Sequence, residues 1–350
     1  SEFGKMIFDT NCPSTSSLEQ LPNEILDSIF SNLDIQSLCV VRSLNRRLKN
    51  VVTHSNKISR IFPKYDWDRF CVRFDEDLKC YEIYMIRYSP RKEQSLYITD
   101  EDIGKKRSLR FLFRNMSIRR IHLRRFPDGT LSDKFVNFLV SEFRQCCSFG
   151  PIGLTISECD MSGLSSEAMS ILIKSCGKSL SHLTISKVYN ARNDTFSDIH
   201  VNILDLKNIN GLYIVDISMA NGHQYLSITD YLFTRLIEED VFPALQLQLC
   251  LVSTLGLAAY LKKWIEYHEF SGFSNISCTF KDCPDISQKG FIFACRNSPV
   301  EFSQFSDDFV SVFHESQGFH TFTVNFGKET YPDQEPAHGF SIQAKPFPKK

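Results

Sequence analysis

Residues 17–54 read SLEQLPNEILDSIFSNLDIQSLCVVRSLNRRLKNVVTH, and their pattern predicts two short helices. Apolar residues recur at helical spacing after Leu21-Pro22, and proline is favoured in the first turn of a helix. Asp34 is a predicted N-cap for a second helical segment that continues to Leu48. A piece this short cannot bury so many apolar residues within itself. The surplus apolar surface therefore predicts a binding partner.

The same stretch resembles an F-box. The features of that family occur here in the family's order, namely Leu21-Pro22, the apolar helical row, the Leu33-Asp34 break and the ending Asn45-Arg46-Arg47-Leu48. One departure is Leu48, which stands near the position where many F-boxes carry Trp. The resemblance implies docking onto the Skp adaptor of a cullin–RING ubiquitin ligase, whereas the alternative is an ordinary helical hairpin in a globular core. The residues that we assign to adaptor contact are Leu21, Pro22, Ile25, Leu26, Ile29, Phe30, Leu33, Leu38, Val41 and Leu44.

The length and composition fit a small helical module followed by one large domain. The chain has 350 residues, of which 42% are hydrophobic, so a sizeable core is possible. We expect a cloning remnant and mobile lead at 1–17, the F-box at 18–56, a substrate-binding repeat domain at 65–327 and a flexible tail at 328–350. The twelve cysteines lie in apolar runs without C-x-x-C spacing. They therefore predict reduced thiols and a cytoplasmic or nuclear protein.

Strand signals begin soon after the helical module. Phe70, Val72 and Phe74 alternate with polar residues, three acidic residues follow, and a run rich in Tyr and Ile returns to Tyr88, which predicts a hairpin over 69–88. Residues 245–261 mimic a membrane span, but they are too few and too polar to cross a bilayer. The strict alternation of Leu and Gln at their start predicts a half-buried strand instead.

From residue 118 onward the sequence repeats the frame L-x-x-L-x-L, with an apolar residue or Cys three positions further on. The second leucine position of this frame advances in steps of 33, 29, 29, 33 and 33 residues, through Ile121, Leu154, Leu183, Leu212, Leu245 and Cys278. Helical patterns at 165–174 and 257–268 lie between the strands. A strand and a helix every ~30 residues are typical of a leucine-rich-repeat-like solenoid, and an α/β domain with accidental spacing is the alternative. The predicted fold class is α/β, with a small N-terminal all-α F-box followed by an irregular leucine-rich-repeat-like β/α solenoid.

An F-box before such a body resembles the expanded nematode families of F-box proteins. The segment Leu257–Ile265, LAAYLKKWI, is similar to the aliphatic-Lys-x-Trp helix of their F-box-associated domain. We expect Trp264 to be buried there between its helix and the adjoining strands, with Tyr260 and Leu261 on the same side.

The sequence contains no arrangement of residues that predicts catalysis. Gly177-Lys178-Ser179 looks like the end of a phosphate loop, but the required first glycine is missing, so Gly177 is expected to end a helix in a left-handed conformation. Cys278, Cys283 and Cys295 do not have zinc-ligand spacing. We therefore expect a non-catalytic protein without a cofactor or a metal.

One charged segment stands out. Residues 103–126 contain nine basic residues and no Asp or Glu, namely Lys105, Lys106, Arg107, Arg110, Arg114, Arg119, Arg120, Arg124 and Arg125. If 118–126 is a repeat strand, its solvent-facing positions lie on the concave binding face of the solenoid, and they are Arg119, Arg120, His122, Arg124 and Arg125. Arginine suits phosphate and carboxylate ligands. The alternative is a solvated basic strand without a ligand. In that case, the loops at 190–196 and 221–225 are the next candidates for target binding.

These observations predict the substrate-recognition subunit of a Skp–cullin–F-box ubiquitin ligase, whose repeat domain captures a target protein with an acidic or phosphorylated segment. A non-proteolytic F-box scaffold that links the Skp adaptor to an RNA-regulatory or chromosomal partner is the second hypothesis. Direct nucleic-acid binding is a weaker one, and no membrane partner is expected.

Overall fold

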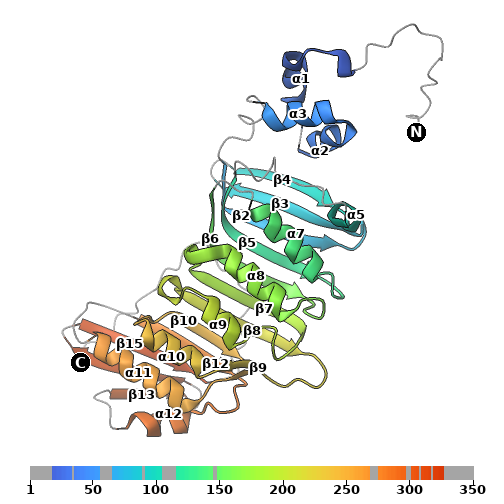
Figure 1. Cartoon of the computed structure of the whole chain (residues 1–350). Coiled ribbons are helices and arrows are strands. Elements are labelled where there is room, and N and C mark those ends of the chain that lie inside the picture. Colours follow the sequence, from blue (N-terminus) through green and yellow to red (C-terminus); the bar gives the residue numbers. More distant parts are fainter. Residues whose placement is uncertain are drawn as a thin grey trace.

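The computed structural model shows a group of N-terminal helices beside a long β-sheet that carries helices on one face (Figure 1). It describes residues 18–33, 35–55, 65–88, 91–104, 116–144, 148–268, 275–296, 301–306, 309–316 and 318–326. The predicted lead at 1–17, the predicted tail at 328–350, the N-cap Asp34 and the basic residues 105–114 lie outside the described residues.

The N-terminal module contains three α-helices in its described part, not the predicted two. Helices α1 (Asn23–Phe30), α2 (Ile35–Leu44) and α3 (Arg46–His54) follow a short 3-10 helix at Leu18–Gln20. The second predicted segment is divided because the Asn45 side chain accepts a hydrogen bond from the Leu48 amide at 2.8 Å and so caps a third helix. Pro22 is the N-cap of α1, one position earlier than predicted.

Thirteen of the described strands form one sheet, which is mostly parallel. Its order is β13-β14-β15-β12-β10-β8-β7-β6-β5-β2-β3-β4, with β1 beside β5. The strands from β15 to β2 pair in parallel, and an antiparallel ribbon extends each end. The bounds are β1 Tyr65–Trp67, β2 Arg69–Asp75, β3 Cys80–Tyr88, β4 Arg91–Ile98, β5 Met116–Phe126, β6 Ser148–Cys159, β7 His182–Ala191, β8 Gly211–Met219, β10 Ala244–Gln248, β12 Asn275–Lys281, β13 Glu301–Ser306, β14 Phe309–Ser316 and β15 Gly318–Asn325. Strands β9 (Leu226–Thr229) and β11 (Cys250–Leu251) form a separate parallel pair.

The register of the parallel strands confirms the predicted repeat spacing. The aligned residues are the six frame positions, with Ile121 opposite Leu154, then Leu183, Leu212, Leu245 and Cys278 in turn. The same row extends beyond the prediction to Phe70 on β2 and Val324 on β15. Each of these side chains is buried, because the row faces the helices that follow the strands.

The helices cover one face of the sheet (Figure 1). Their bounds are α5 Asp100–Gly104, α7 Asp133–Phe143, α8 Ser166–Cys176, α9 Asp198–Ile203, α10 Tyr231–Glu238, α11 Thr254–His268 and α12 Gln288–Cys295. Short 3-10 turns occur at Gly177–Ser179 and Leu206–Asn208. Trp264, Tyr260 and Leu261 of α11 are all fully buried, as predicted. The continuous apolar layer between helices and sheet is the core of the domain.

A column of left-handed residues explains why the frame places its last apolar residue three positions after the third leucine position, and not two. Four residues after each aligned position the backbone has a φ of 52–58°, although none of these residues is glycine: Arg125, Glu158, Lys187, Asp216, Leu249 and Asp282. Alternation along a strand would point these side chains inward. The positive φ turns the chain by one position, so the next residue is buried instead, as Phe126 and Cys159 show.

Other local predictions can also be compared with the structure. The hairpin over 69–88 is confirmed by the antiparallel β2–β3 pair, and Asp75 accepts hydrogen bonds from the amides of Asp77 and Leu78 in its turn. The half-buried strand that begins at Leu245 corresponds to β10. Gly177 has a φ of 64° after α8, which confirms the predicted helix end.

Candidate protein-binding surfaces

The N-terminal helices leave apolar side chains exposed. Ile25 and Ile29 on α1 are 48% and 40% exposed, and Val40 and Leu44 on α2 are 54% and 61% exposed. Each pair is separated by four residues and therefore lies on one face of its helix. About half of each side chain is exposed, so each helix carries a small apolar face on its surface.

Three of the residues assigned to adaptor contact are instead interior. Leu26, Phe30 and Leu38 are at most 1% exposed, because they pack into the core that α3 completes with Leu48. Their side chains hold the helices together and offer no surface to a partner in this conformation. Burial of this kind stabilises a fold by about 1.5–3 kcal/mol for each large apolar side chain.

The remaining assigned residues divide between surface and core. Leu21, Leu33 and Val41 are half-buried against the core, and Pro22 is exposed. Arg47 at the basic end of the motif donates a hydrogen bond to the Leu21 carbonyl at 2.5 Å, and a second one to Asn23 Oδ1 at 3.1 Å. This arginine therefore fixes the start of α1 to α3.

Comparison with known families gives this module its identity. Residues 18–60 match the F-box domain. The chain carries an F-box. An F-box implies binding to a Skp adaptor and thus to a cullin–RING ligase, and F-box proteins are typically non-catalytic adaptors. A search of the curated proteins finds no match to this chain.

Beyond the F-box, the second candidate surface is the sheet face opposite the helices, where β5 places its basic residues. Arg119, Arg120 and Arg125 are exposed, whereas His122 and Arg124 are half-buried. Arg119 also faces solvent because the β5–β6 register shifts between Ile118 and Arg120. The structure thus confirms that the five predicted side chains avoid the helix-side core.

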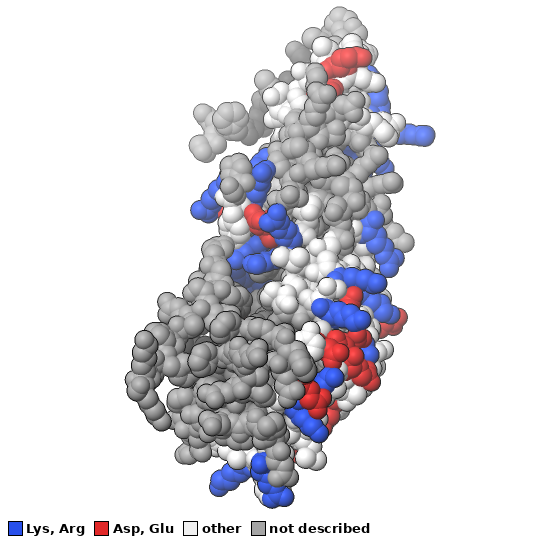
Figure 2. Space-filling view, turned by 90° about the vertical axis from the view of Figure 1, so that its left-hand side faces the viewer, with Lys and Arg blue, Asp and Glu red and all other residues white. Residues whose placement is uncertain are grey.

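Acidic neighbours neutralise part of this surface. Glu158 on β6 lies 3.0 Å from Arg125 and 3.4 Å from Arg124, while Asp68 lies 3.8 Å from Arg119. In the described part of the chain, Arg120 has no acidic residue within ion-pair distance. Figure 2 shows mainly basic side chains grouped in the left-hand part of its view, whereas basic and acidic side chains mix along the right-hand edge.

Arg69 on β2 lies next to Arg120 on the same face of the sheet, and the sequence reasoning missed this residue. Because Phe70 is aligned with Ile121, these two arginines directly precede an aligned pair on adjacent parallel strands. The Arg69 guanidinium carbon lies 5.5 Å from the centre of the Tyr88 ring, and its buried Nε has no hydrogen-bond partner. The alternation of Phe70, Val72 and Phe74 is the signal that could have found it, since the residue directly before Phe70 must face the other way.

The electrostatics of this face are set by burial and by the arginines. Burial, together with the charges of Arg69, Arg120 and Arg124, lowers the pKa of His122 to about 4. Burial and the charge of Arg120 also lower the pKa of His182 on β7. Both imidazoles are therefore neutral at pH 7, and the local potential is positive.

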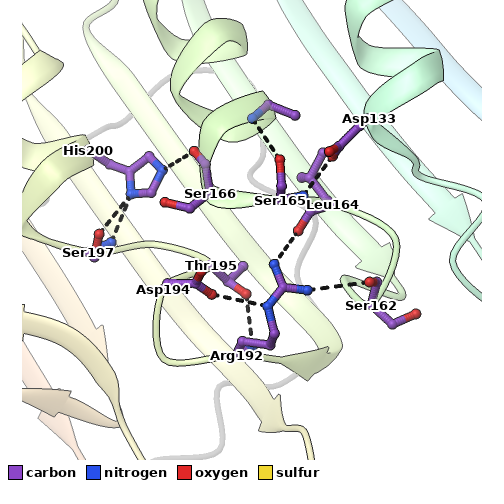
Figure 3. Close-up of polar contacts among 11 residues, drawn as sticks. Asp133, Ser162, Leu164, Ser165, Ser166, Arg192, Asp194, Thr195, Ser197 and His200 are labelled. Carbon is purple, nitrogen blue, oxygen red and sulfur yellow. Dashed lines mark hydrogen bonds and ion pairs between the residues drawn. The ribbon is translucent and has the colours of Figure 1, made fainter.

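The loop at 190–196, the next candidate for target binding, uses its polar side chains for contacts within the fold (Figure 3). Arg192 donates hydrogen bonds to the carbonyl oxygens of Leu164 at 2.9 Å and Ser162 at 3.4 Å, and it pairs with Asp194 at 3.1 Å. Its own amide donates to Thr195 Oγ1 at 2.8 Å. These contacts join two neighbouring repeat loops, so this loop connects repeats.

Within the described residues, no three His, Cys, Asp or Glu side chains come together as metal ligands. The eight cysteines with described side chains are all buried free thiols, as predicted, whereas Cys146 and Cys147 lie outside the described residues. None of the described helices is long and apolar enough to cross a bilayer.

Proposed function

We propose that this chain is the substrate-recognition subunit of a Skp–cullin–F-box ubiquitin ligase. The observation that carries the proposal is the F-box match together with the exposed apolar pairs Ile25/Ile29 and Val40/Leu44. Exposed apolar side chains at helical spacing on two neighbouring helices are suited to a helical partner such as the Skp adaptor. The chain itself performs no chemistry in this proposal and acts by raising the effective concentration of target lysines near a recruited E2 enzyme.

The large domain is the proposed target-binding part. Its repeated strand–helix units, aligned at every frame position, support a leucine-rich-repeat-like solenoid related to the F-box-associated domains of nematodes. The long sheet face opposite the helices offers an extended surface for a protein segment. The basic character around β5 favours an acidic or phosphorylated target, and we place the complex in the cytoplasm or nucleus.

The adaptor half of the proposal is tested by co-purification. Replacement of Leu21 and Pro22 together with Ala is expected to abolish recovery of the Skp adaptor while the circular dichroism of the sheet domain stays unchanged. Undiminished recovery of the adaptor by this double variant would contradict the assignment.

The alternative is a non-proteolytic F-box scaffold that links the adaptor to an RNA-regulatory or chromosomal partner. Quantitative mass spectrometry of a pulldown with the intact chain and with an F-box deletion separates the two functions. A ligase subunit recovers cullin and RING subunits through the F-box, whereas a scaffold recovers the adaptor without them.

A further inference from the structure

We propose that Arg69, Arg120 and Arg124 form a binding site for a single phosphate group on a segment of the target protein. This inference rests on the proposed function for its partner, but it concerns a site that lies outside the F-box. Arg69 on β2 is added to the basic residues of β5, whereas Arg119 and Arg125 are left out because they are paired with Asp68 and Glu158. Arg124 is kept because its buried Nε has no hydrogen-bond partner, although its Nη2 lies 3.4 Å from Glu158.

The register of two strands brings the three arginines to one place. Arg69 and Arg120 lie side by side on β2 and β5, one residue before the aligned pair Phe70 and Ile121. Arg124 lies four residues further along β5 on the same face. Between them is His122, whose ring is close enough to all three guanidinium groups for each to lower its pKa.

A glycine on the neighbouring strand leaves room for the side chain of Arg120. A side chain at Gly153 on β6, the residue aligned with Arg120, would lie 3.4 Å from Arg120 Cγ. The aliphatic part of Arg120 therefore packs against Gly153 on the neighbouring strand. Its charge reaches His182 on β7, because the pKa of that histidine is lowered by Arg120 as well as by burial.

Two donors in this place are not used by the described part of the fold. The Nε atoms of Arg69 and Arg124 are buried and have no hydrogen-bond partner. The groups that face His122 on the adjoining strands are Cys71 on β2 and Thr155 on β6, and neither carries a negative charge at neutral pH. A phosphate could accept several charge-assisted hydrogen bonds here, together with one from the neutral imidazole.

Adjacent like charges also destabilise the sheet. Cross-strand neighbours of the same charge destabilise a strand pair. Arg73 and Arg124 are a second such pair on these strands, but each has a carboxylate, Glu82 and Glu158. Arg69 and Arg120 have no carboxylate among the described residues, so a bound anion is what offsets their repulsion.

A phosphorylated protein segment fits this arrangement better than a nucleic acid does. Acidic residues flank the arginines on both sides, at Asp68, Glu82 and Glu158. A nucleic acid needs a continuous basic track that follows several phosphates. In the described part of this face, the basic charge that has no acidic partner is confined to one point, which matches one phosphate.

The first experiment measures binding of inorganic phosphate to the full chain in complex with the Skp adaptor. Histidine-selective NMR follows His122, whose resonance is identified by its loss in His122→Gln. Saturating phosphate is expected to raise the pKa of His122 by about one pH unit, because a bound anion favours the charged imidazole. The combined variant Arg69→Gln/Arg120→Gln is expected to abolish this shift. An unchanged pKa of His122 at saturating phosphate overturns the proposal.

The second experiment identifies the source of the phosphate. A degenerate peptide library with one fixed phosphoserine, its unphosphorylated twin and a single-stranded RNA are compared on immobilised complex. We expect the phosphorylated library to be retained about tenfold more strongly than its twin, and Arg69→Gln or Arg120→Gln to remove this preference. Preferential retention of RNA, or equal retention of both libraries, contradicts the proposal.

Matched controls are available on the same strand. Arg119→Gln and Arg125→Gln remove equal charge from residues already paired with acids, and we expect them to change retention less than twofold. Thermal unfolding supplies a further readout, since Arg120→Gln should leave the midpoint unchanged or raise it. A lower midpoint, or equal losses of retention in all four variants, indicates a structural or non-specific role. Adaptor recovery is measured for every variant, so failure of the F-box assignment is recognised separately.

Discussion

The exposed face of α1 provides the sharpest test of the F-box, because neighbouring residues on this helix have opposite roles. Ile25 and Ile29 are 48% and 40% exposed, whereas Leu26 is completely buried. The double variant Ile25→Ala/Ile29→Ala should weaken adaptor binding and leave folding largely intact. The single variant Leu26→Ala should do the reverse.

The magnitudes follow from the exposed areas. Full burial of an isoleucine side chain is worth about 1.5–3 kcal/mol, so covering a little under half of each side chain is worth ~1 kcal/mol. The two truncations together should cost ~2 kcal/mol of binding free energy, which raises the dissociation constant roughly 30-fold. Leu26→Ala removes a fully buried side chain and should lower the free energy of unfolding by about 2–5 kcal/mol.

The assay combines calorimetric titration with purified Skp adaptor and urea unfolding of the same samples. The double variant is expected to lose no more than ~1 kcal/mol of stability per substitution, since partly exposed positions tolerate truncation. A dissociation constant within threefold of the parent chain would refute the reasoning, because the exposed apolar face would then have no part in adaptor binding. An equal loss of stability in both variants would refute the assigned burial.

Three further predictions concern the sheet domain. Trp264→Ala should lower the free energy of unfolding by about 3–5 kcal/mol in urea denaturation, because the side chain is fully buried with its ring 5.4 Å from that of Phe322; a change near zero would contradict its placement in the core. The pKa of His200 is lowered by burial, so the unfolded chain binds a proton more readily and the free energy of unfolding should fall as pH drops below about 6.5. His200→Asn should flatten this dependence between pH 7.5 and 5.5. If the two proteins give parallel curves of unfolding free energy against pH, His200 is excluded as a cause. Arg192→Ala should lower the free energy of unfolding by about 1–3 kcal/mol in thermal unfolding, since it leaves the Leu164 carbonyl without its side-chain donor. Asp194→Ala should lower it clearly less, and equal losses of stability would argue against the inter-repeat role of Arg192.

The prediction for His200 rests on the geometry of its two ring nitrogens (Figure 3). Nδ1 lies 3.0 Å from the Ser197 amide and must accept its hydrogen bond, while Nε2 lies 3.0 Å from the Ser166 carbonyl oxygen and must donate. Both contacts are satisfied only by the neutral imidazole. Protonation of Nδ1 would displace the Ser197 amide at the start of α9, so a fall in pH removes a helix-capping interaction.

The repeat of the large domain could be predicted from the sequence alone. Apolar residues at fixed intervals indicate which side chains must leave water, and that requirement is local to each strand and helix. The spacing therefore identified the aligned row from Ile121 to Cys278 before any contact was known. The F-box motif and the burial of Trp264 were accessible for the same reason.

Other features depend on what packs against each residue, and only the tertiary structure decided them. Ile25 and Leu26 are similar apolar neighbours in sequence, but α3 and the rest of the core cover one and not the other. Arg120 and Arg125 look equivalent in the basic segment, but Glu158 arrives from the next strand beside Arg125 and not beside Arg120. Arg69 reaches Arg120 from about 50 residues earlier in the chain through strand pairing. Periodicity states which residues need burial or solvent, whereas the identity of the neighbour that supplies it is a property of the folded chain.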